Sequence, residues 1–524
     1  MLQAATSRRG FVAGAAATTA LVAATSRTAF ADEAAVPAQW DASLPSTWDR
    51  EAEMVVVGCG IAGTCALLEG YELGLDVLGI EAGDDIKKCS CKLSGGWFAG
   101  ACTSLQDDAG IVDDVELMVK DVRNDGGDFG DPDVIRAWCE LSGETIDWLW
   151  DLGVDLVPQV FDAKSAGSNS HSLARCYQAN PVGDGLGWMT GIENALNDYG
   201  IEILYETRAT KLYRNAEGRV VGVKAQTADG GEINVQATKG VLVSAGGLGS
   251  DIDLWAIYAP VMRDIAEQAK TVVSAAPLTV QGDSAVLLRD VNAFMYPTIA
   301  NYGGAGIVID PEKPGDGNVS PYIWSDGLIE VNANGERFFD ESNFSIFFGD
   351  KPYRDQPGMW NVCIFDDEWR QSSGGQAQAQ NVIDSCAEHG ITDTVFSADT
   401  IEELAEHWGM DPATLVAAVD DFNARVDSQE ADQFGRTNFG QKIATPPFWG
   451  IELNVIVATS KGGAKINSKG EVIDNFEQVI PGLYGAGESA FFPCQGNGKE
   501  HVVGGCNSAA ACYGRICARS IAQA

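Results

Sequence analysis

Three glycines and one acidic residue near the start of the chain have the types and spacing of a dinucleotide site. A β-branched run precedes the glycines, and a second apolar run precedes the acid: residues 55–57, then Gly58, Gly60 and Gly63, then residues 77–80 and Glu81. Glycines at this spacing permit a tight turn, close approach of the backbone to a pyrophosphate, and tight packing of a helix on the strand. An acid after the second strand can bind a ribose diol. The pattern therefore predicts a β-α-β unit that binds a dinucleotide.

Composition and charge narrow the class of protein. The chain has 524 residues, which favours two or more domains, and its 45% hydrophobic and 21% charged residues are ordinary for a soluble globular protein. The net charge of −39 argues against nucleic acid as a partner and against an anionic membrane surface. The charge is accounted for by solubility, and docking to a basic or cationic redox partner stays open as an alternative.

The N-terminal residues 1–31 are predicted to be an export signal and not part of the fold. Twin arginines, Arg8 and Arg9, precede a weakly apolar run over residues 12–24, and Ala29-Phe30-Ala31 fits a cleavage site. The apolar run is too short to span a membrane. This segment resembles a Tat signal, which would place the folded, cofactor-loaded protein in the periplasm or at the outer face of the cell membrane.

Thirteen cysteines in an exported protein raise the question of disulfides. Several of them fall in the predicted nucleotide turn and in a helical C-terminus, where small buried residues are expected. Cys89-Ser90-Cys91 does not have an iron–sulfur spacing, although a cluster stays an open alternative.

The remaining pattern indicates an interrupted first domain. Residues 110–150 have helical spacing, and short strands are expected over 201–213, 220–228, 232–238 and 239–247, then again over 451–458 and 464–467. Residues 256–440 are richer in Pro, Asn, Asp and aromatic side chains. We therefore predict a signal (1–31), a first part of the nucleotide domain (52–255), an inserted second domain (256–440) and a second part of the nucleotide domain (441–524).

Several further segments resemble flavoproteins of the fumarate reductase/succinate dehydrogenase superfamily, a group that also includes proteins like 3-ketosteroid dehydrogenases. The segments are residues 89–96, residues 240–247, Gly282-Asp283, residues 331–341, residues 481–488 and Tyr513-Gly514-Arg515. The resemblance runs from about Ala52 to the C-terminus. It implies an α/β fold with a Rossmann-like FAD-binding domain, discontinuous in sequence, and an inserted α+β cap domain for the substrate.

The resemblance also implies which residues hold FAD. The pyrophosphate and ribose would be bound by Gly58, Gly60, Ala62, Gly63 and Glu81. The other implied contacts are Cys89, Ser90, Ser94, Gly95, Gly96, Ala209, Ala245, Gly246, Asp283, Glu488, Cys506 and Asn507. Among these, Ser94 and Gly95 would lie along the isoalloxazine, Asp283 and Glu488 would hold flavin or ribityl groups, and Cys506 and Asn507 would place amides near the pyrimidine ring.

The chain departs from the family where fumarate would bind. Counting from the matched motifs, the two family arginines fall at Trp324 and His501, H-P-T becomes Tyr296-Pro297-Thr298, and H-T-M-G-G corresponds to the segment from Ala458 to Gly463. Arginine is suited to bidentate binding of carboxylates, and neither Tyr nor Trp replaces it. We therefore expect an activated alkene other than fumarate, such as an enone or an acrylate.

Reduction of such an alkene needs a proton donor or a group that polarises the carbonyl. His501 is the first candidate, because the ordinary pKa of histidine suits proton transfer near neutral pH. Tyr296 and Tyr322 are the next candidates, as hydroxyl donors. His171, near Arg175, is a further candidate for a contact with the flavin or a channel.

The leading hypothesis is an exported FAD-dependent oxidoreductase that acts on CH–CH bonds. It would reduce a small-molecule alkene by hydride transfer from flavin N5, in anaerobic respiration, with electrons from an external membrane or haem protein. Two alternatives stay open, namely a desaturase similar to 3-ketosteroid dehydrogenase and a non-catalytic flavin electron-transfer protein. No metal ligand set is predicted. The sequence does not determine the substrate, the direction of the reaction, the electron donor or the oligomeric state.

Overall fold

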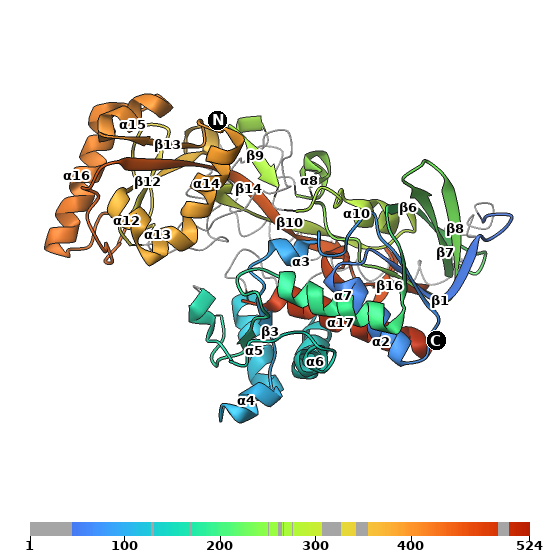
Figure 1. Ribbon diagram of the computed structural model, residues 1–524. Helices are drawn as coiled ribbons and strands as arrows, with labels where there is room; N and C mark the ends of the chain where they lie inside the picture. The colour runs from blue at the N-terminus through green and yellow to red at the C-terminus, as the bar shows by residue number, and fades with distance from the viewer. Residues whose placement is uncertain are drawn as a thin grey trace, which may run out of the picture.

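The computed structural model describes residues 44–126, 130–166, 170–249, 251–259, 265, 267–274, 276–306, 326–341, 355–490 and 502–524. These residues form two lobes that are joined by a pair of long strands (Figure 1). Within this described part of the chain, no helix is both long and apolar enough to cross a membrane.

The core of the first lobe is a parallel sheet in the strand order β16-β8-β1-β2-β5. Its strands are β1 (Arg50–Val57), β2 (Val77–Ile80), β5 (Glu202–Leu204), β8 (Glu232–Val243) and β16 (Val479–Gly485). The antiparallel strand β15 (Glu471–Ile473) extends the sheet beyond β16. Both ends of the chain contribute to this sheet, which confirms the predicted discontinuous α/β fold.

Three helices line the sheet of the first lobe and fix its central strands. They are α2 (Ile61–Glu72), α7 (Leu186–Tyr199) and α17 (Gly505–Ala522), and α2 lies between the other two (Figure 1). The packing of α17 on α2 is close, because a Cβ on Gly514 would come within 2.0 Å of the Ala62 carbonyl oxygen. The last helix of the chain is therefore seated directly on the helix that follows the glycine turn.

Two further parts of this lobe were expected from the sequence. The predicted helical stretch 110–150 forms α5 (Val115–Gly126) and α6 (Pro132–Asp151), preceded by the short α4 (Ser104–Asp108). The predicted short strands form an antiparallel meander of β6 (Thr207–Arg214), β7 (Val220–Thr227) and β8. The strands expected over 232–238 and 239–247 are one continuous strand, β8, because its first half pairs with β7 while its second half pairs with β1 and β16.

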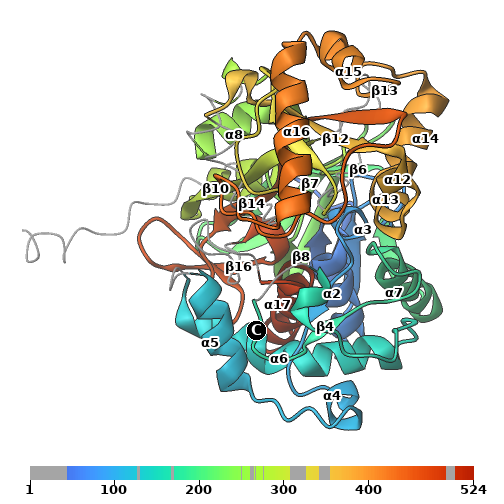
Figure 2. The ribbon, with the colours of Figure 1, turned by 90° about the vertical axis from the view of Figure 1, so that its left-hand side faces the viewer.

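The second lobe is the cap, which we define as β11 (Ile329–Asn332), β12 (Asn361–Asp366), β13 (Val395–Ala398), the first six residues of β14, and the helices α12 to α16. One face of its sheet packs on α15 (Ile401–Trp408) and α16 (Pro412–Ser428) through Ile329, Val331, Val362 and Ile364. The other face packs near α12 (Asp367–Gln371), α13 (Ser373–Gln378) and α14 (Gln380–His389). Figures 1 and 2 show this lobe at the end of the molecule away from α6.

The two lobes are joined by a ribbon of β10 (Met295–Gly306) and β14 (Phe448–Ala464). The first part of β14 pairs with β12 and β13 in the cap. Its second part pairs with β10 and with β9 (Val272–Ser274). The sequence predicted two separate strands over 451–458 and 464–467. The observed strand is continuous because β10 pairs with it through residues 460–464, across several register shifts.

Candidate functional site

The glycine turn between β1 and α2 is closed by backbone contacts that only glycine allows. Gly58 has a φ of +87°, and a Cβ on it would lie 2.4 Å from the Cα of Ala245. A Cβ on Gly63 would lie 2.0 Å from the carbonyl oxygen of Gly58. Predicted cofactor residues 58, 63 and 245 are thus packed against one another at the carboxyl ends of β1 and β8. These contacts fix the start of α2 relative to the sheet.

Gly60 differs from its neighbours, because a Cβ on it would face open space. The nearest atom to that Cβ would be the Cβ of Cys89, at 3.9 Å. Gly60 is also the N-cap of α2 and provides no side-chain cap, so the first amides of the helix point into this space. Uncapped amides and the positive end of the helix dipole favour an anion. The turn, including Ala62 in the first helical turn, therefore fits a pyrophosphate, with Cys89 and Ser90 at the start of α3 (Ser90–Leu93) on the opposite wall.

Glu81 directly follows β2 and is oriented by two backbone amides. The amide of Cys59 donates to Oε2 at 2.8 Å, and the amide of Gly83 donates to Oε1 at 2.7 Å. A carboxylate has about four acceptor sites, so each oxygen keeps capacity for a hydroxyl donor. The side chain is half-buried beside the glycine turn. This geometry suits the ribose contact that the sequence predicted.

Asp283 lies close to Glu81, at the start of α10 (Asp283–Asp290). Its carboxylate pairs with Arg208. Burial raises the pKa of Asp283, the charge of Arg208 lowers it, and the nearby charge of Glu81 raises it further. Ala209, which follows Arg208 on β6, is buried at the same end of the site. The structure therefore places Asp283 near Glu81 and Arg208, and its predicted contact with the flavin or ribityl groups stays a prediction.

Segments from opposite ends of the chain meet at the other end of the site. Asn507, in the first turn of α17, donates from Nδ2 to Ser94 Oγ at 3.0 Å and to the Trp97 carbonyl at 3.2 Å. Gly96 has a φ of +68°, and a Cβ there would lie 2.0 Å from the Asp184 carbonyl oxygen. The predicted residues Ser94, Gly95, Gly96, Cys506 and Asn507 thus lie together, although more than four hundred positions separate the two segments.

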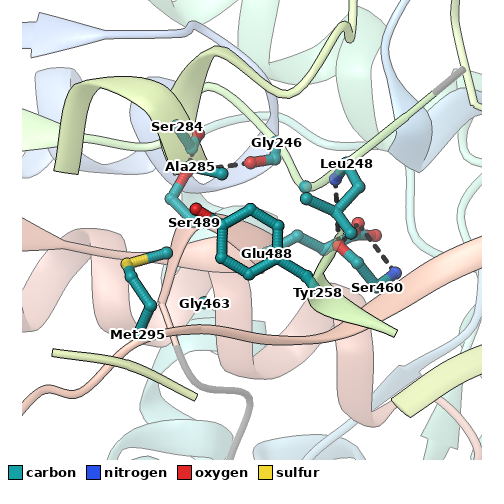
Figure 3. Close-up of a pocket in the computed structure, with 11 residues that line it drawn as sticks. Gly246, Leu248, Tyr258, Ser284, Ala285, Met295, Ser460, Gly463, Glu488 and Ser489 are labelled. Carbon is teal, nitrogen blue, oxygen red and sulfur yellow. Dashed lines mark hydrogen bonds between the residues drawn. The ribbon is translucent and has the colours of Figure 1, made fainter. Parts of the chain in front are cut away.

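A pocket lies where β8, α10, β14 and the 3-10 turn Gly487–Ser489 come together (Figure 3). Ser489 Oγ donates to the Gly246 carbonyl at 3.2 Å and shares a hydrogen bond of 2.7 Å with Ser284 Oγ. Ser460 Oγ donates to Glu488 Oε2 at 3.2 Å. The remaining wall is largely apolar and is formed by Leu248, Tyr258, Ala285, Met295, Gly247 and Gly463.

Glu488 is the titratable group of this pocket. Burial is the main cause that raises the pKa of its carboxyl to about 8, and nearby Cys506 raises it as well. The hydrogen bonds from Ser460 act in the opposite direction and are the weaker influence. In the protein without ligand, this carboxyl therefore keeps its proton at neutral pH and can donate as well as accept a hydrogen bond.

The structure locates one of the three predicted catalytic residues. His501 and Tyr322 lie outside the described residues, as does Trp324. Tyr296 is half-buried on β10 and pairs with Gly463 of β14. Its ring contacts Phe294 at 5.2 Å between centroids, and burial raises the pKa of its hydroxyl, so it is a neutral donor at pH 7. Since side chains alternate along a strand, Tyr296 faces away from the pocket wall formed by Met295.

His171 contacts the segment that leads into α17. It is 7% exposed, and its Nε2 lies 2.9 Å from the carbonyl oxygen of Val503. The Val503 amide donates to Ser170 Oγ at 3.1 Å, and His171 Nδ1 is buried without a hydrogen-bond partner among the described residues. Burial lowers the pKa of His171. The predicted contact with the flavin or a channel is not tested, but the structure shows a clear role in holding residues 502–504.

Two residues of the site were not found from the sequence. Arg208 pairs with Asp283, and Ser460 donates to Glu488. Both lie on strands, in segments where no motif marks them, so their contacts depend on which strands become neighbours. A charged residue inside an otherwise half-buried strand was the available signal for Arg208.

Comparison with known proteins decides the nature of this site. Residues 53–505 match the family described as FAD binding domain. The chain belongs to this family. The cofactor is therefore FAD, and the glycine turn, the uncapped start of α2 and the paired Ser94 and Asn507 fit it.

Several members of the family are similar over much of this chain. NADH:acrylate oxidoreductase of Vibrio harveyi is 29% identical over 69% of the chain, which spans only 34% of that protein. Fumarate reductase (cytochrome) of Shewanella frigidimarina is 28% identical over 85% of the chain and 73% of its own length. Vinyl phenol reductase of Lactiplantibacillus plantarum is 26% identical over 90% of the chain and 96% of its own length.

The fold is shared with a solved flavocytochrome c3 fumarate reductase, in an open conformation. The TM-score is 0.77 at 23% identity, over 94% of this chain and 82% of that one. The predicted fold and cofactor are thus confirmed. The predicted class, an FAD-dependent oxidoreductase similar to fumarate reductases, is confirmed at that level.

Proposed function

We propose that this flavoprotein reduces a C=C bond that is activated by a neighbouring carbonyl or carboxylate. The observation that carries the proposal is the near full-length similarity to a vinyl phenol reductase, together with similarity to an NADH:acrylate oxidoreductase over 69% of this chain. When bound and reduced, FAD supplies the hydride. The protein must hold the alkene beside it, exclude water and supply a proton.

The pocket supports an acceptor other than fumarate. Its described wall combines Leu248, Tyr258 and Met295 with hydroxyl groups and the carboxyl of Glu488, and no arginine is among these lining residues. A dicarboxylate needs cationic partners for both of its ends, because an unpaired buried charge is costly. His501, Tyr322 and Tyr296 remain the proposed proton donors or carbonyl partners.

We also propose that the protein is exported and receives electrons from a separate carrier. The twin arginines Arg8 and Arg9 with the following weakly apolar run support export by the Tat route. The net charge of −39 favours docking of a cationic donor, such as a haem protein. Replacement of both arginines by lysine is expected to retain the protein in the cytoplasm, and unchanged export of that variant would contradict this part of the proposal.

The catalytic proposal is tested by anaerobic reoxidation of the reduced holoprotein. The flavin is photoreduced and mixed with acrylates, enones, vinyl phenols and fumarate, each paired with its saturated analogue as a control. We expect rapid reoxidation and a saturated product with at least one class of activated alkene other than fumarate. Reoxidation by fumarate alone would contradict the substrate argument, and reoxidation by no alkene would contradict the proposed reaction.

A further inference from the structure

The pocket contains one hydroxyl group that is not engaged by a neighbouring residue. Tyr258 ends α8 (Ile252–Tyr258), is half-buried, and lines the pocket together with Leu248 and Met295. Figure 3 shows its ring extending into the pocket, with the hydroxyl end toward Ser489. Among the residues that the structure describes, this hydroxyl has no hydrogen-bond partner. It is therefore available to a ligand in the pocket.

The three serine hydroxyls that line the same pocket are already used as donors. Ser460 Oγ donates to Glu488 Oε2 at 3.2 Å, and Ser489 Oγ donates to a backbone carbonyl at 3.2 Å. A serine hydroxyl has only one hydrogen, so the 2.7 Å hydrogen bond between Ser284 and Ser489 uses the hydrogen of Ser284. Of the described hydroxyls in this pocket, that of Tyr258 can thus donate to a ligand without breaking an existing hydrogen bond.

The charge of the pocket favours a neutral acceptor over an acid. The residues that line it include the carboxyl of Glu488 and neither lysine nor arginine. A carboxylate would bring a negative charge beside this carboxyl without a cation to pair with, which is costly in a buried site. A ketone oxygen accepts hydrogen bonds without carrying a charge. The apolar side chains of Leu248 and Met295 suit the hydrocarbon part of such a ligand.

We propose that Tyr258 is a catalytic residue that donates a hydrogen bond to the carbonyl oxygen of an α,β-unsaturated ketone. This inference rests on the proposed reduction of an activated alkene and narrows the acceptor to enones. When a hydride adds to the β-carbon, the electron pair of the C=C bond moves toward the carbonyl and its oxygen becomes an enolate oxygen. A proton then adds to the α-carbon and restores the ketone. The hydrogen bond from Tyr258 is stronger to the enolate than to the ketone, so it lowers the barrier to hydride transfer.

Binding of ligands that cannot be reduced tests Tyr258 independently of turnover. The oxidised holoprotein is titrated by calorimetry with 4-phenylbutan-2-one, with butylbenzene, which has a methylene group in place of the carbonyl, and with the acid 3-phenylpropanoate. Tyr258→Phe removes the hydroxyl and keeps the ring. Tyr213→Phe is the matched control, because it removes a hydroxyl that is hydrogen-bonded to Asn234 in the antiparallel meander, away from the pocket.

We expect the unaltered protein and Tyr213→Phe to bind the ketone more tightly than the hydrocarbon or the acid. In Tyr258→Phe, the dissociation constant of the ketone should rise about three- to tenfold, as for loss of one hydrogen bond between neutral groups, while that of butylbenzene stays within about twofold. The proposal would be overturned by an unchanged dissociation constant of the ketone, by an equal rise for both neutral ligands, by tighter binding of the acid, or by no binding of the ketone to the unaltered protein.

Two further measurements identify the group that accepts this hydrogen bond. FAD also carries carbonyl and hydroxyl oxygens, so its dissociation constant is compared in the two proteins and should agree within about twofold. A rise equal to that of the ketone would assign the Tyr258 hydroxyl to the cofactor and overturn the proposal. The infrared carbonyl band of bound 4-phenylbutan-2-one, labelled with carbon-13 at the carbonyl, should lie at lower frequency in the unaltered protein than in Tyr258→Phe. An identical band in both would contradict a hydrogen bond from Tyr258.

The reoxidation screen separates this inference from the proposed reaction. With an enone, Tyr258→Phe should reoxidise the reduced flavin about tenfold or more slowly than the unaltered protein in a single turnover. Loss of ketone binding in Tyr258→Phe without reduction of any alkene by the unaltered protein would leave the carbonyl contact and remove the reaction. Equal rates with an enone in both proteins would leave the reaction and remove the role of Tyr258.

Discussion

The glycine turn and the β10/β14 ribbon form two sides of the same site by different means. At the turn, Gly58 and Gly63 are in contact with backbone atoms. The groups available to FAD there are the backbone amides at the start of α2 and the open space next to Gly60. At the ribbon, the contact with the pocket is made by a side chain, that of Ser460 on β14, and the pairing of β14 with β10 contains several register shifts. A site made of backbone tolerates no change of residue, whereas a site made of strand side chains can change one residue without changing the fold. The cofactor is therefore fixed by the architecture, and the substrate by a few side chains.

Gly63→Ala should disrupt the glycine turn, the side of the site that is formed by backbone atoms. The new Cβ would lie 2.0 Å from the Gly58 carbonyl oxygen. Neither α2 nor the turn can move to relieve this contact without losing its packing on the sheet. We expect a loss of about 3 kcal/mol or more in the free energy of unfolding, with little FAD retained, measured by urea denaturation and flavin absorbance. Gly74→Ala is the control, because its Cβ meets nothing within 4 Å and its φ of +82° alone costs about 1 kcal/mol. Equal losses in the two variants would contradict the role assigned to the contact.

Gly60→Ala should separate the two roles of the glycine turn, because it should weaken FAD binding without changing the stability of the fold. Its Cβ would enter the space above the turn, where the nearest described atom is 3.9 Å away, and its φ of −70° suits alanine. We expect unchanged stability of the flavin-free protein and a rise of about tenfold or more in the dissociation constant for FAD, since the methyl group occupies the position of the pyrophosphate. Retained affinity would show that FAD does not approach the turn at Gly60.

Glu488→Gln tests the side-chain part of the pocket through its pH dependence. A carboxyl whose pKa rises to about 8 on folding keeps a proton that the unfolded chain loses above pH 4.5, so the native state loses stability as pH rises toward 8. Glutamine has no proton to lose. The flavin-free variant should therefore gain stability over the unaltered protein between pH 5 and pH 9, by up to about 4 kcal/mol for a shift of this size. A constant difference across this range would mean that Glu488 ionises normally.

His171→Gln should have the smallest effect on the free energy of unfolding, and this effect should appear only at acidic pH. Burial lowers the pKa of His171, so below about pH 6.5 the unfolded chain takes up a proton that the native state resists, and stability falls. Glutamine can still donate to the Val503 carbonyl but does not titrate. We expect equal stability at pH 8 and a gain of under about 1 kcal/mol for the variant at pH 6. His171→Leu leaves the Val503 carbonyl without its hydrogen-bond donor. The free energy of unfolding of this variant should be lower than that of the unaltered protein by roughly 1 kcal/mol at every pH.

The contrast between the glycine turn and the β10/β14 ribbon also explains which parts of the site could be predicted from the sequence. Gly58, Gly60, Gly63 and Glu81 were found because backbone conformation restricts the residue type at fixed spacing. Ser94 and Asn507 were assigned to one site by resemblance, and the structure brings them to a hydrogen bond. The fold followed from these segments, since both ends of the chain carry cofactor motifs.

The ribbon could not be predicted in the same way. Ser460 reaches Glu488 because of the face of β14 on which its side chain lies, and that face depends on the pairing of β14 with β10. Tyr296 was assigned from a three-residue match, which carries no information on the face. The ion pair of Asp283 with Arg208 joins α10 to β6, two elements that are far apart in the sequence. In each case the missing information was which distant elements become neighbours in the fold, and local spacing does not encode this.

The continuity of β14 has a mechanical consequence. One strand of seventeen residues belongs to the cap sheet at its start and reaches Glu488 of the FAD lobe at its end. Because the strand is paired in both lobes with no loop between its halves, a displacement of the cap at Phe448 would be expected to reach Ser460 through the strand itself. The position of the cap and the position of the Ser460 hydroxyl beside Glu488 are therefore linked by one continuous strand.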